Sequence, residues 1–129
     1  MNNSAQIQLI ECPRDAMQGI KTFIPTVEKV GYLQMLVECG FHTLDVGSFV
    51  SPKAIPQMAD TAAVLEALDL SRTDTKLLTI IANVRGAKAA AEQEKVDFLG
   101  YPFSISETFQ MRNTHKTICL LYTSDAADD

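Results

Sequence analysis

The chain has 129 residues, of which 47% are hydrophobic and 21% are charged, and a formal net charge of -5. This is the balance of one ordinary globular domain. Three of the acidic residues fall within the last five positions and lysine and arginine form no block, so the charge pattern argues against nucleic-acid or membrane partners. The three cysteines lack CxxC spacing, and neither a basic leader nor a long apolar segment is present, which predicts a cytoplasmic protein without a disulfide framework.

Strand and helix patterns alternate along the chain. A short apolar run at Ile7–Glu11 predicts a first strand, which Pro13 ends and a loop follows. A helix is predicted over Thr26–Cys39, with a core-facing stripe formed by Val27, Val30, Leu33, Leu36 and Val37. The elements that follow are a strand at 41–46, a loop at 47–56, a helix at 57–68, a strand at 76–82, a helix at 86–95, a strand at 96–101 and a loop at 102–113.

This order of elements predicts a parallel α/β sheet covered by helices. No GxGxxG motif follows the first strand, so a dinucleotide-binding fold has no support. A (β/α)8 barrel is the better candidate, but it takes about 250 residues. We therefore predict the N-terminal half of a (β/α)8 TIM barrel, with about four parallel strands.

Polar residues gather where the predicted strands end. Arg14 and Asp15 follow the first strand, and Asp45 and Ser48 come at the end of the second. Later strands are followed by Asn83, Arg85, Ser106, Glu107 and Asn113. The carboxyl ends of barrel strands form the face where catalytic groups sit, and carboxylates there could bind a hard cation.

Each of these residues also has a structural interpretation. An Arg-Asp pair in a loop is often a solvated ion pair. Asp45 could cap the next turn, Ser48 and Ser106 could be turn residues, and Asn83 could satisfy loop backbone groups. Neither histidine has a partner at HxH spacing, so a metal site built on histidines is not expected.

Two segments resemble loops of the 3-hydroxy-3-methylglutaryl-CoA lyases. ECPRDAMQ at 11–18 is similar to the family's loop after the first strand, where an Arg-Asp pair precedes a glutamine. SFVSPKAIPQM at 48–58 resembles the loop after the second strand almost letter for letter. The second match is the more specific, because isopropylmalate and homocitrate synthases share the Arg-Asp motif. Supporting matches are Asn83, Gly86, Ser106, Glu107, Phe109 and Asn113.

The resemblance implies cleavage of an acyl-CoA substrate, 3-hydroxy-3-methylglutaryl-CoA, to acetyl-CoA and acetoacetate by a homodimer that binds Mg²⁺ or Mn²⁺. It implies that Asp15 is a metal ligand and that Arg14 stabilises the enolate of the departing acetyl-CoA. Gln18 and Ser48 would orient the substrate and the arginine. Asp45 stands where many members carry glutamate, and its shorter carboxylate would hold Arg14 or act in proton transfer.

The resemblance covers residues 10–118, which predicts a partial TIM-barrel lyase domain at 1–118. Residues 119–129, CLLYTSDAADD, resemble a translated sequencing adapter and are expected to be a non-native tail. The family's HxH pair, its asparagine and its cysteine-bearing glycine loop, all from later strands, are missing, so we expect no appreciable lyase activity from this polypeptide and an open edge at the fourth strand. A Claisen-type synthase and a non-catalytic half-barrel module remain the alternatives.

Overall fold

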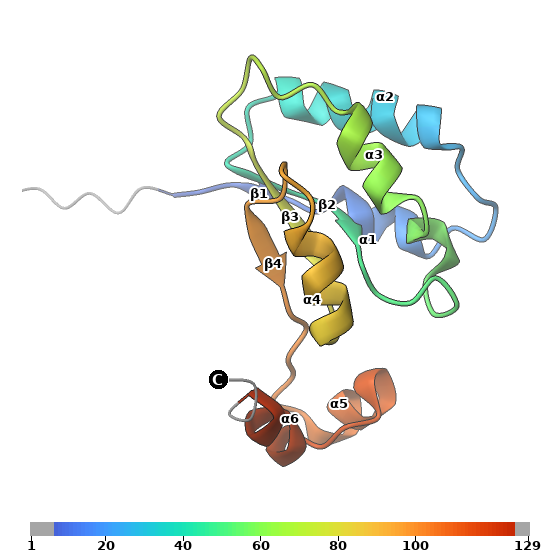
Figure 1. Ribbon diagram of the computed structural model, residues 1–129, viewed down its shortest axis with the longest axis vertical. Helices are drawn as coiled ribbons and strands as arrows, with labels where there is room; N and C mark the ends of the chain where they lie inside the picture. Colours follow the sequence, from blue (N-terminus) through green and yellow to red (C-terminus); the bar gives the residue numbers. More distant parts are fainter. Residues whose placement is uncertain (1–6, 126–129) are drawn as a thin grey trace, which may run out of the picture.

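A computed structural model describes residues 7–125, and in it four parallel strands form one sheet in the order β1-β2-β3-β4 (Figure 1). The strands are β1 (Ile10–Glu11), β2 (Thr43–Ser48), β3 (Lys76–Ile80) and β4 (Phe98–Gly100). The helices are α1 (Pro13–Gln18), α2 (Thr26–Glu38), the short 3-10 helix η1 (Pro56–Met58), α3 (Thr61–Ala67), α4 (Val84–Ala91), α5 (Glu107–Thr114) and α6 (Ile118–Asp125). The predicted parallel α/β architecture is confirmed.

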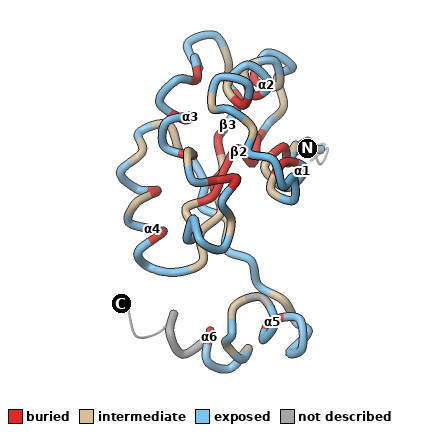
Figure 2. Tube along the Cα trace, turned by 90° about the vertical axis from the view of Figure 1, so that its right-hand side faces the viewer, coloured by how far each residue is buried: buried red, intermediate tan, exposed pale blue. Residues whose placement is uncertain are grey.

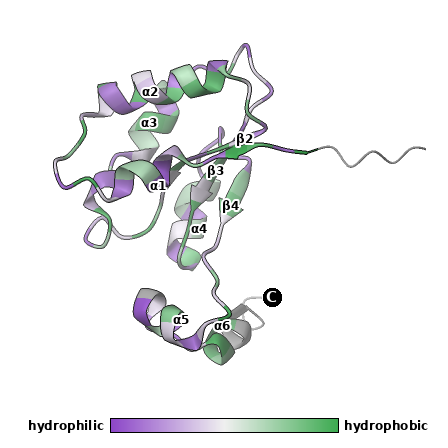
Figure 3. Ribbon diagram, turned by 180° about the vertical axis from the view of Figure 1, so that it is seen from behind, coloured by the Kyte–Doolittle hydropathy of each residue, from purple (hydrophilic) through white to green (hydrophobic). Residues whose placement is uncertain are grey.

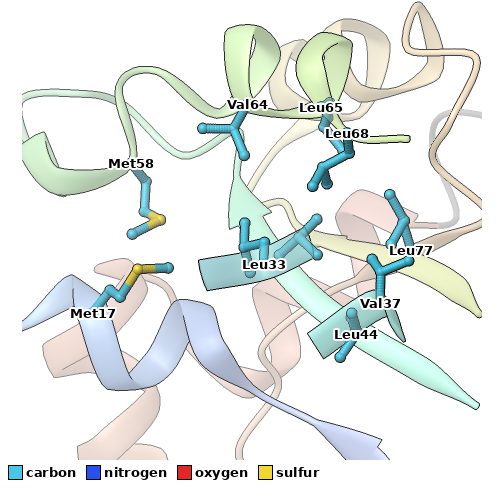
Figure 4. Close-up of a cluster of buried hydrophobic side chains, with 10 residues drawn as sticks. Met17, Leu33, Val37, Leu44, Met58, Val64, Leu65, Leu68 and Leu77 are labelled. Carbon is cyan, nitrogen blue, oxygen red and sulfur yellow. The ribbon is translucent and has the colours of Figure 1, made fainter. Parts of the chain in front are cut away.

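The hydrophobic core lies between the sheet and the helices α2 and α3. Leu44 and Leu77 of the sheet pack with apolar side chains of the two helices, as Figure 4 shows. Val46 belongs to the same cluster. Buried residues accordingly concentrate along β2 and β3 in Figure 2. Val27 is 77% exposed, so the predicted core stripe of α2 is wrong at its first member. Lys29 takes the buried position there instead.

The second strand ends two residues later than predicted, at Ser48 instead of Val46. Sequence patterning assigned Gly47 to a loop, but in the structure it belongs to the strand, at a point that α3 approaches closely. A Cβ atom on Gly47 would lie 2.5 Å from Thr61 Cγ2. Glycine is thus required for close packing at this position.

Two helices stand where loops were predicted. α1 follows β1 directly and begins with Pro13, whose fixed φ suits the first helical position. α5 begins after Ser106, whose side chain accepts a hydrogen bond from Phe109 N at 3.3 Å. Neither segment carries a clear apolar stripe, so hydrophobic periodicity could not reveal them.

Neither α2 nor α3 covers the opposite face of the sheet. Asp45, Leu78 and Phe98 are paired across β2, β3 and β4 and therefore share this face. Phe98 is 44% exposed and Ile10, on the edge strand β1, is 56% exposed. Figure 3 shows the hydrophobic colouring of β4 at the other edge. Both edges of the sheet are thus apolar and open within the described part of the chain.

α5 and α6 lie beyond β4, apart from the sheet (Figure 1). Glu107 of α5 accepts a hydrogen bond from Ile118 N at 3.1 Å, which joins the two helices. α6 includes the first part of the predicted tail, and residues 126–129 lie outside the described residues. No helix among residues 7–125 is long and apolar enough to cross a membrane.

Candidate active site around Arg14 and Asp45

Arg14 and Asp45 form the centre of the site. α1 carries Arg14 just beyond β1. Asp45 is the third of the six residues of the neighbouring β2, so it lies within the strand rather than at its end as predicted. Arg14 Nε lies 3.1 and 2.9 Å from the two carboxylate oxygens of Asp45, and Nη2 donates to Oδ2 at 2.7 Å. This fork geometry is the most directional ion pair available to an arginine.

The other edge of the guanidinium is held by residues of its own helix. Arg14 Nη1 donates to Gln18 Oε1 at 2.7 Å. Gln18 Nε2 donates to Asp15 Oδ1 at 3.0 Å, and the same oxygen lies 3.4 Å from Arg14 Nη1. Residues 14, 15 and 18 meet because positions three and four apart lie on one helix face. The guanidinium plane is therefore fixed from both sides.

The pair is partly withdrawn from water. The exposed fraction of the side chain is 13% for Arg14 and 5% for Asp45. Burial raises the pKa of Asp45, and the hydrogen bonds and charge of Arg14 oppose that rise. Burial alone would lower the pKa of Arg14, but its hydrogen bonds to Asp45, together with the negative charges of Asp45 and Asp15, outweigh this and raise the pKa. Arg14 is therefore a permanent, oriented cation.

Ser48 lies on the same face of the sheet as Asp45, although the two residues are three positions apart. Simple alternation would place them on opposite faces. A bulge between Asp45 and Gly47 shifts the register, so that Asp45 pairs with Leu78 and Ser48 with Ile80. The Ser48 hydroxyl accepts from Val50 N at 3.1 Å and donates to Ile80 O at 3.4 Å. These contacts match its structural interpretation as a turn residue.

Three of the polar residues after the later strands, Asn83, Ser106 and Glu107, make structural hydrogen bonds. Asn83 caps α4 by accepting from Gly86 N at 2.9 Å. Ser48, Asn83 and Arg85 line one hollow of about 230 Å³ between the ends of β2 and β3. Ser106 and Glu107 serve α5 and α6 as described above. Asn113 lies in α5, and its side chain is outside the described part of the structure.

Asp15 could serve as one metal ligand. Its side chain is 66% exposed, and its carboxylate oxygens are of the kind that Mg²⁺ and Mn²⁺ prefer. The described residues donate two hydrogen bonds to the Asp15 carboxylate, and both go to Oδ1. Among residues 7–125, no group of three histidine, cysteine or acidic side chains could hold a metal ion. The described residues could therefore supply one ligand of a metal site, Asp15, but they do not form a complete site.

Lys29 and Gln57 are two buried polar residues near α1 that sequence reasoning missed. Their exposed fractions are 2% and 4%. Gln57 falls within the segment 48–58, but the pattern gave no reason to choose it over its neighbours. Lys29 lies on a helix whose apolar stripe points to other positions.

Comparisons with known proteins identify related enzymes. No protein-family model matches the chain. It is 34% identical over 113 residues to the mitochondrial hydroxymethylglutaryl-CoA lyase of Arabidopsis thaliana, and the match covers 87% of this chain and 24% of the plant enzyme. It is 33% identical over 119 residues to the 3-hydroxy-3-isohexenylglutaryl-CoA/hydroxymethylglutaryl-CoA lyase of Pseudomonas aeruginosa, covering 92% of this chain and 39% of that enzyme.

Solved structures agree with these relatives. A lyase of Acinetobacter baumannii, in complex with coenzyme A and 3-methylmalate, matches with a TM-score of 0.82 and 30% identity over 91% of this chain and 38% of its own. The Pseudomonas aeruginosa lyase matches with a TM-score of 0.80 and 33% identity over 88% of this chain and 38% of its own. The chain thus spans well under half the length of these relatives, and its four strands form half of their TIM barrel.

Proposed function

We propose, from the homology of this chain to the hydroxymethylglutaryl-CoA lyases, that it supplies the arginine-bearing half of the active site of such a lyase. The observation that carries the proposal is the set of hydrogen bonds from Arg14 to Asp45 and Gln18, which fix the orientation of the guanidinium. A cation held at both edges of its plane loses little further freedom when a substrate oxygen arrives. The names of the relatives favour cleavage over a synthase reaction.

The reaction breaks the bond between C2 and C3 of 3-hydroxy-3-methylglutaryl-CoA. The hydroxyl on C3 loses its proton and becomes the ketone of acetoacetate, while the electron pair of the broken bond forms the enolate of acetyl-CoA, which then takes up a proton. Negative charge therefore develops on the thioester oxygen. A guanidinium has five N–H donors. The contacts of Arg14 to Asp45, Gln18 and Asp15 use four of them, so one N–H of Nη2 is not engaged by these residues. That donor would meet the enolate oxygen.

The other site residues are proposed to act around Arg14. Asp45 is a positioning residue, because both of its oxygens are engaged by Arg14. Gln18 orients the opposite edge, and Ser48 shapes the turn beside the site. Asp15 would bind Mg²⁺ or Mn²⁺ together with ligands from outside residues 7–125. Such an ion would polarise the substrate's hydroxyl and carboxylate oxygens.

The substrate class follows from the relatives. The Acinetobacter baumannii structure holds coenzyme A, and we propose an acyl-CoA substrate for the protein to which this chain corresponds. The homodimer and the cytoplasmic location expected from the sequence stay predictions.

A chimaeric enzyme tests the proposal. Residues 10–118 would replace the matched segment of the Pseudomonas aeruginosa lyase, and acetoacetate release would be followed with and without Mg²⁺. We expect metal-dependent cleavage, and a loss in kcat of about 100-fold or more for Arg14→Lys, which cannot form the fork. The control is Arg72→Lys, at an exposed turn before β3. A folded chimaera without activity, or one indifferent to Arg14→Lys, would contradict the proposal. The 129-residue chain alone is expected to release no acetoacetate.

A further inference from the structure

The buried side chain of Gln57 lies at the end of the segment 48–58. That segment is the most specific sequence match in the chain, yet the proposed function uses only Ser48 from it. Gln57 is 4% exposed and sits in η1, just before Met58. A buried amide needs hydrogen-bond partners, so its contacts indicate what it holds.

All three contacts go to the backbone between α1 and α2. Gln57 Oε1 accepts from Ile24 N at 2.8 Å. Gln57 Nε2 donates to Ile20 O and to Thr22 O, both at 2.9 Å. One side chain thus holds residues 20–24, five of the seven residues that connect α1 to α2, at both ends and in the middle.

Gln57 is itself held from the other side by Lys29. The Lys29 ammonium donates to the backbone carbonyl of Gln57 and forms an ion pair with Asp60 at 2.7 Å. It also lies 4.1 Å from the centre of the Phe23 ring, within the connection that Gln57 holds. A buried ammonium is tolerated only with such partners. Gln57 therefore acts from a fixed position.

The connection that Gln57 holds continues directly from α1. α1 has six residues, too few for a helix to be stable without tertiary contacts. Ile20 N donates to Met17 O at 3.0 Å, which joins the connection to the last turn of α1. Figure 4 shows Met17 of α1 and Met58, the neighbour of Gln57, pointing toward each other in the core. The end of α1 is thus anchored beside Gln57.

We propose that Gln57 is a positioning residue for Arg14, acting through the connection at residues 20–24 and the short helix α1. The catalytic meaning of this placement rests on the proposed function of Arg14, but the placement itself is testable without any activity. Loss of the three hydrogen bonds would let α1 shift and weaken the fork between Arg14 and Asp45.

The test measures hydrogen exchange at the side-chain Nε–H of Arg14 by NMR on the 129-residue chain. The chain has four arginines, and Arg14→Lys identifies the resonance. Gln57→Met keeps the length of the side chain and removes its hydrogen bonds. The matched control is Gln34→Met, because Gln34 also makes two backbone hydrogen bonds to one loop residue, Asp69, each 3.0 Å long.

We expect Gln57→Met to speed exchange at Arg14 Nε–H by about tenfold or more through local opening, while amides of β2 and β3 keep their protection. Gln34→Met should leave exchange at Arg14 unchanged. The inference is wrong if Gln57→Met does not change exchange at Arg14, or if Gln34→Met speeds it equally. Loss of sheet protection in Gln57→Met alone would also overturn it, since Gln57 would then hold the whole fold rather than the site.

Discussion

Arg14 and Asp45, 31 positions apart, form a two-pronged ion pair that joins α1 to the second strand of the sheet. The pair belongs both to the candidate site and to the folded core beside it. Its removal therefore has a consequence for stability that can be measured without substrate.

Asp45→Asn is expected to lower the free energy of unfolding by about 3 kcal/mol, because it leaves the guanidinium of Arg14 partly buried without its counter-charge. Urea unfolding followed by circular dichroism measures this. Lys76→Met is the control, since Lys76 and Asp97 form an ion pair at 3.3 Å in which Lys76 is 50% exposed, and such pairs contribute less than about 1 kcal/mol. Equal losses in the two variants would contradict a special role for the buried pair.

Thr79 lies on β3 with no exposed surface, and its hydroxyl has no hydrogen-bond partner among the described residues. Thr79→Val removes an unsatisfied polar atom at constant shape, so we expect the free energy of unfolding to rise by about 1 kcal/mol. Thr75→Val is the contrast, because the Thr75 hydroxyl donates to Phe41 O at 2.8 Å and its removal should lower stability by about 1 kcal/mol. A destabilising Thr79→Val would show that the hydroxyl has a partner.

Strand polarity and the meeting of Arg14 with Asp45 could be predicted from the sequence. The alternation of strand and helix segments along the chain predicts a parallel sheet, and parallel strands bring their carboxyl ends to one face. The resemblance placed Arg14 beside the carboxylate at position 45, and one of the two roles it allowed for Asp45 is the contact observed. Asp45 reaches Arg14 although it is one methylene shorter than glutamate.

Other features depend on contacts that no local pattern encodes. The bulge that brings Ser48 onto the face of Asp45 arises from pairing between β2 and β3. Lys29 is buried because Asp60 and Gln57, from a distant segment, satisfy its ammonium. An isolated lysine beside Val27 and Val30 is ordinarily read as solvent-facing, so the sequence could not show this network.

Cys12 should react slowly at neutral pH. Cys12 is an exposed residue, but partial desolvation still raises the pKa of its thiol, Asp45 raises the pKa further, and Arg14 partly opposes both effects. Since only the thiolate is nucleophilic, the pH midpoint for alkylation by iodoacetamide should lie above about 8.5, the ordinary value for cysteine. The measurement uses a chain in which Cys39 and Cys119 are serine. Asp45→Asn removes a negative charge and should lower this midpoint, and an upward shift would contradict the assigned cause.

The uncovered face of the sheet should make the chain self-associate. Ile10 and Phe98 expose apolar surface on the two edge strands, and unpaired strand edges with apolar side chains favour association. Sedimentation velocity should show concentration-dependent species, together with strong binding of the dye ANS, and Phe98→Lys should reduce both. Met35→Lys is the control, because Met35 is 61% exposed on α2, whose buried side faces the core. If Met35→Lys reduced association as much as Phe98→Lys, the open sheet face would not be its cause.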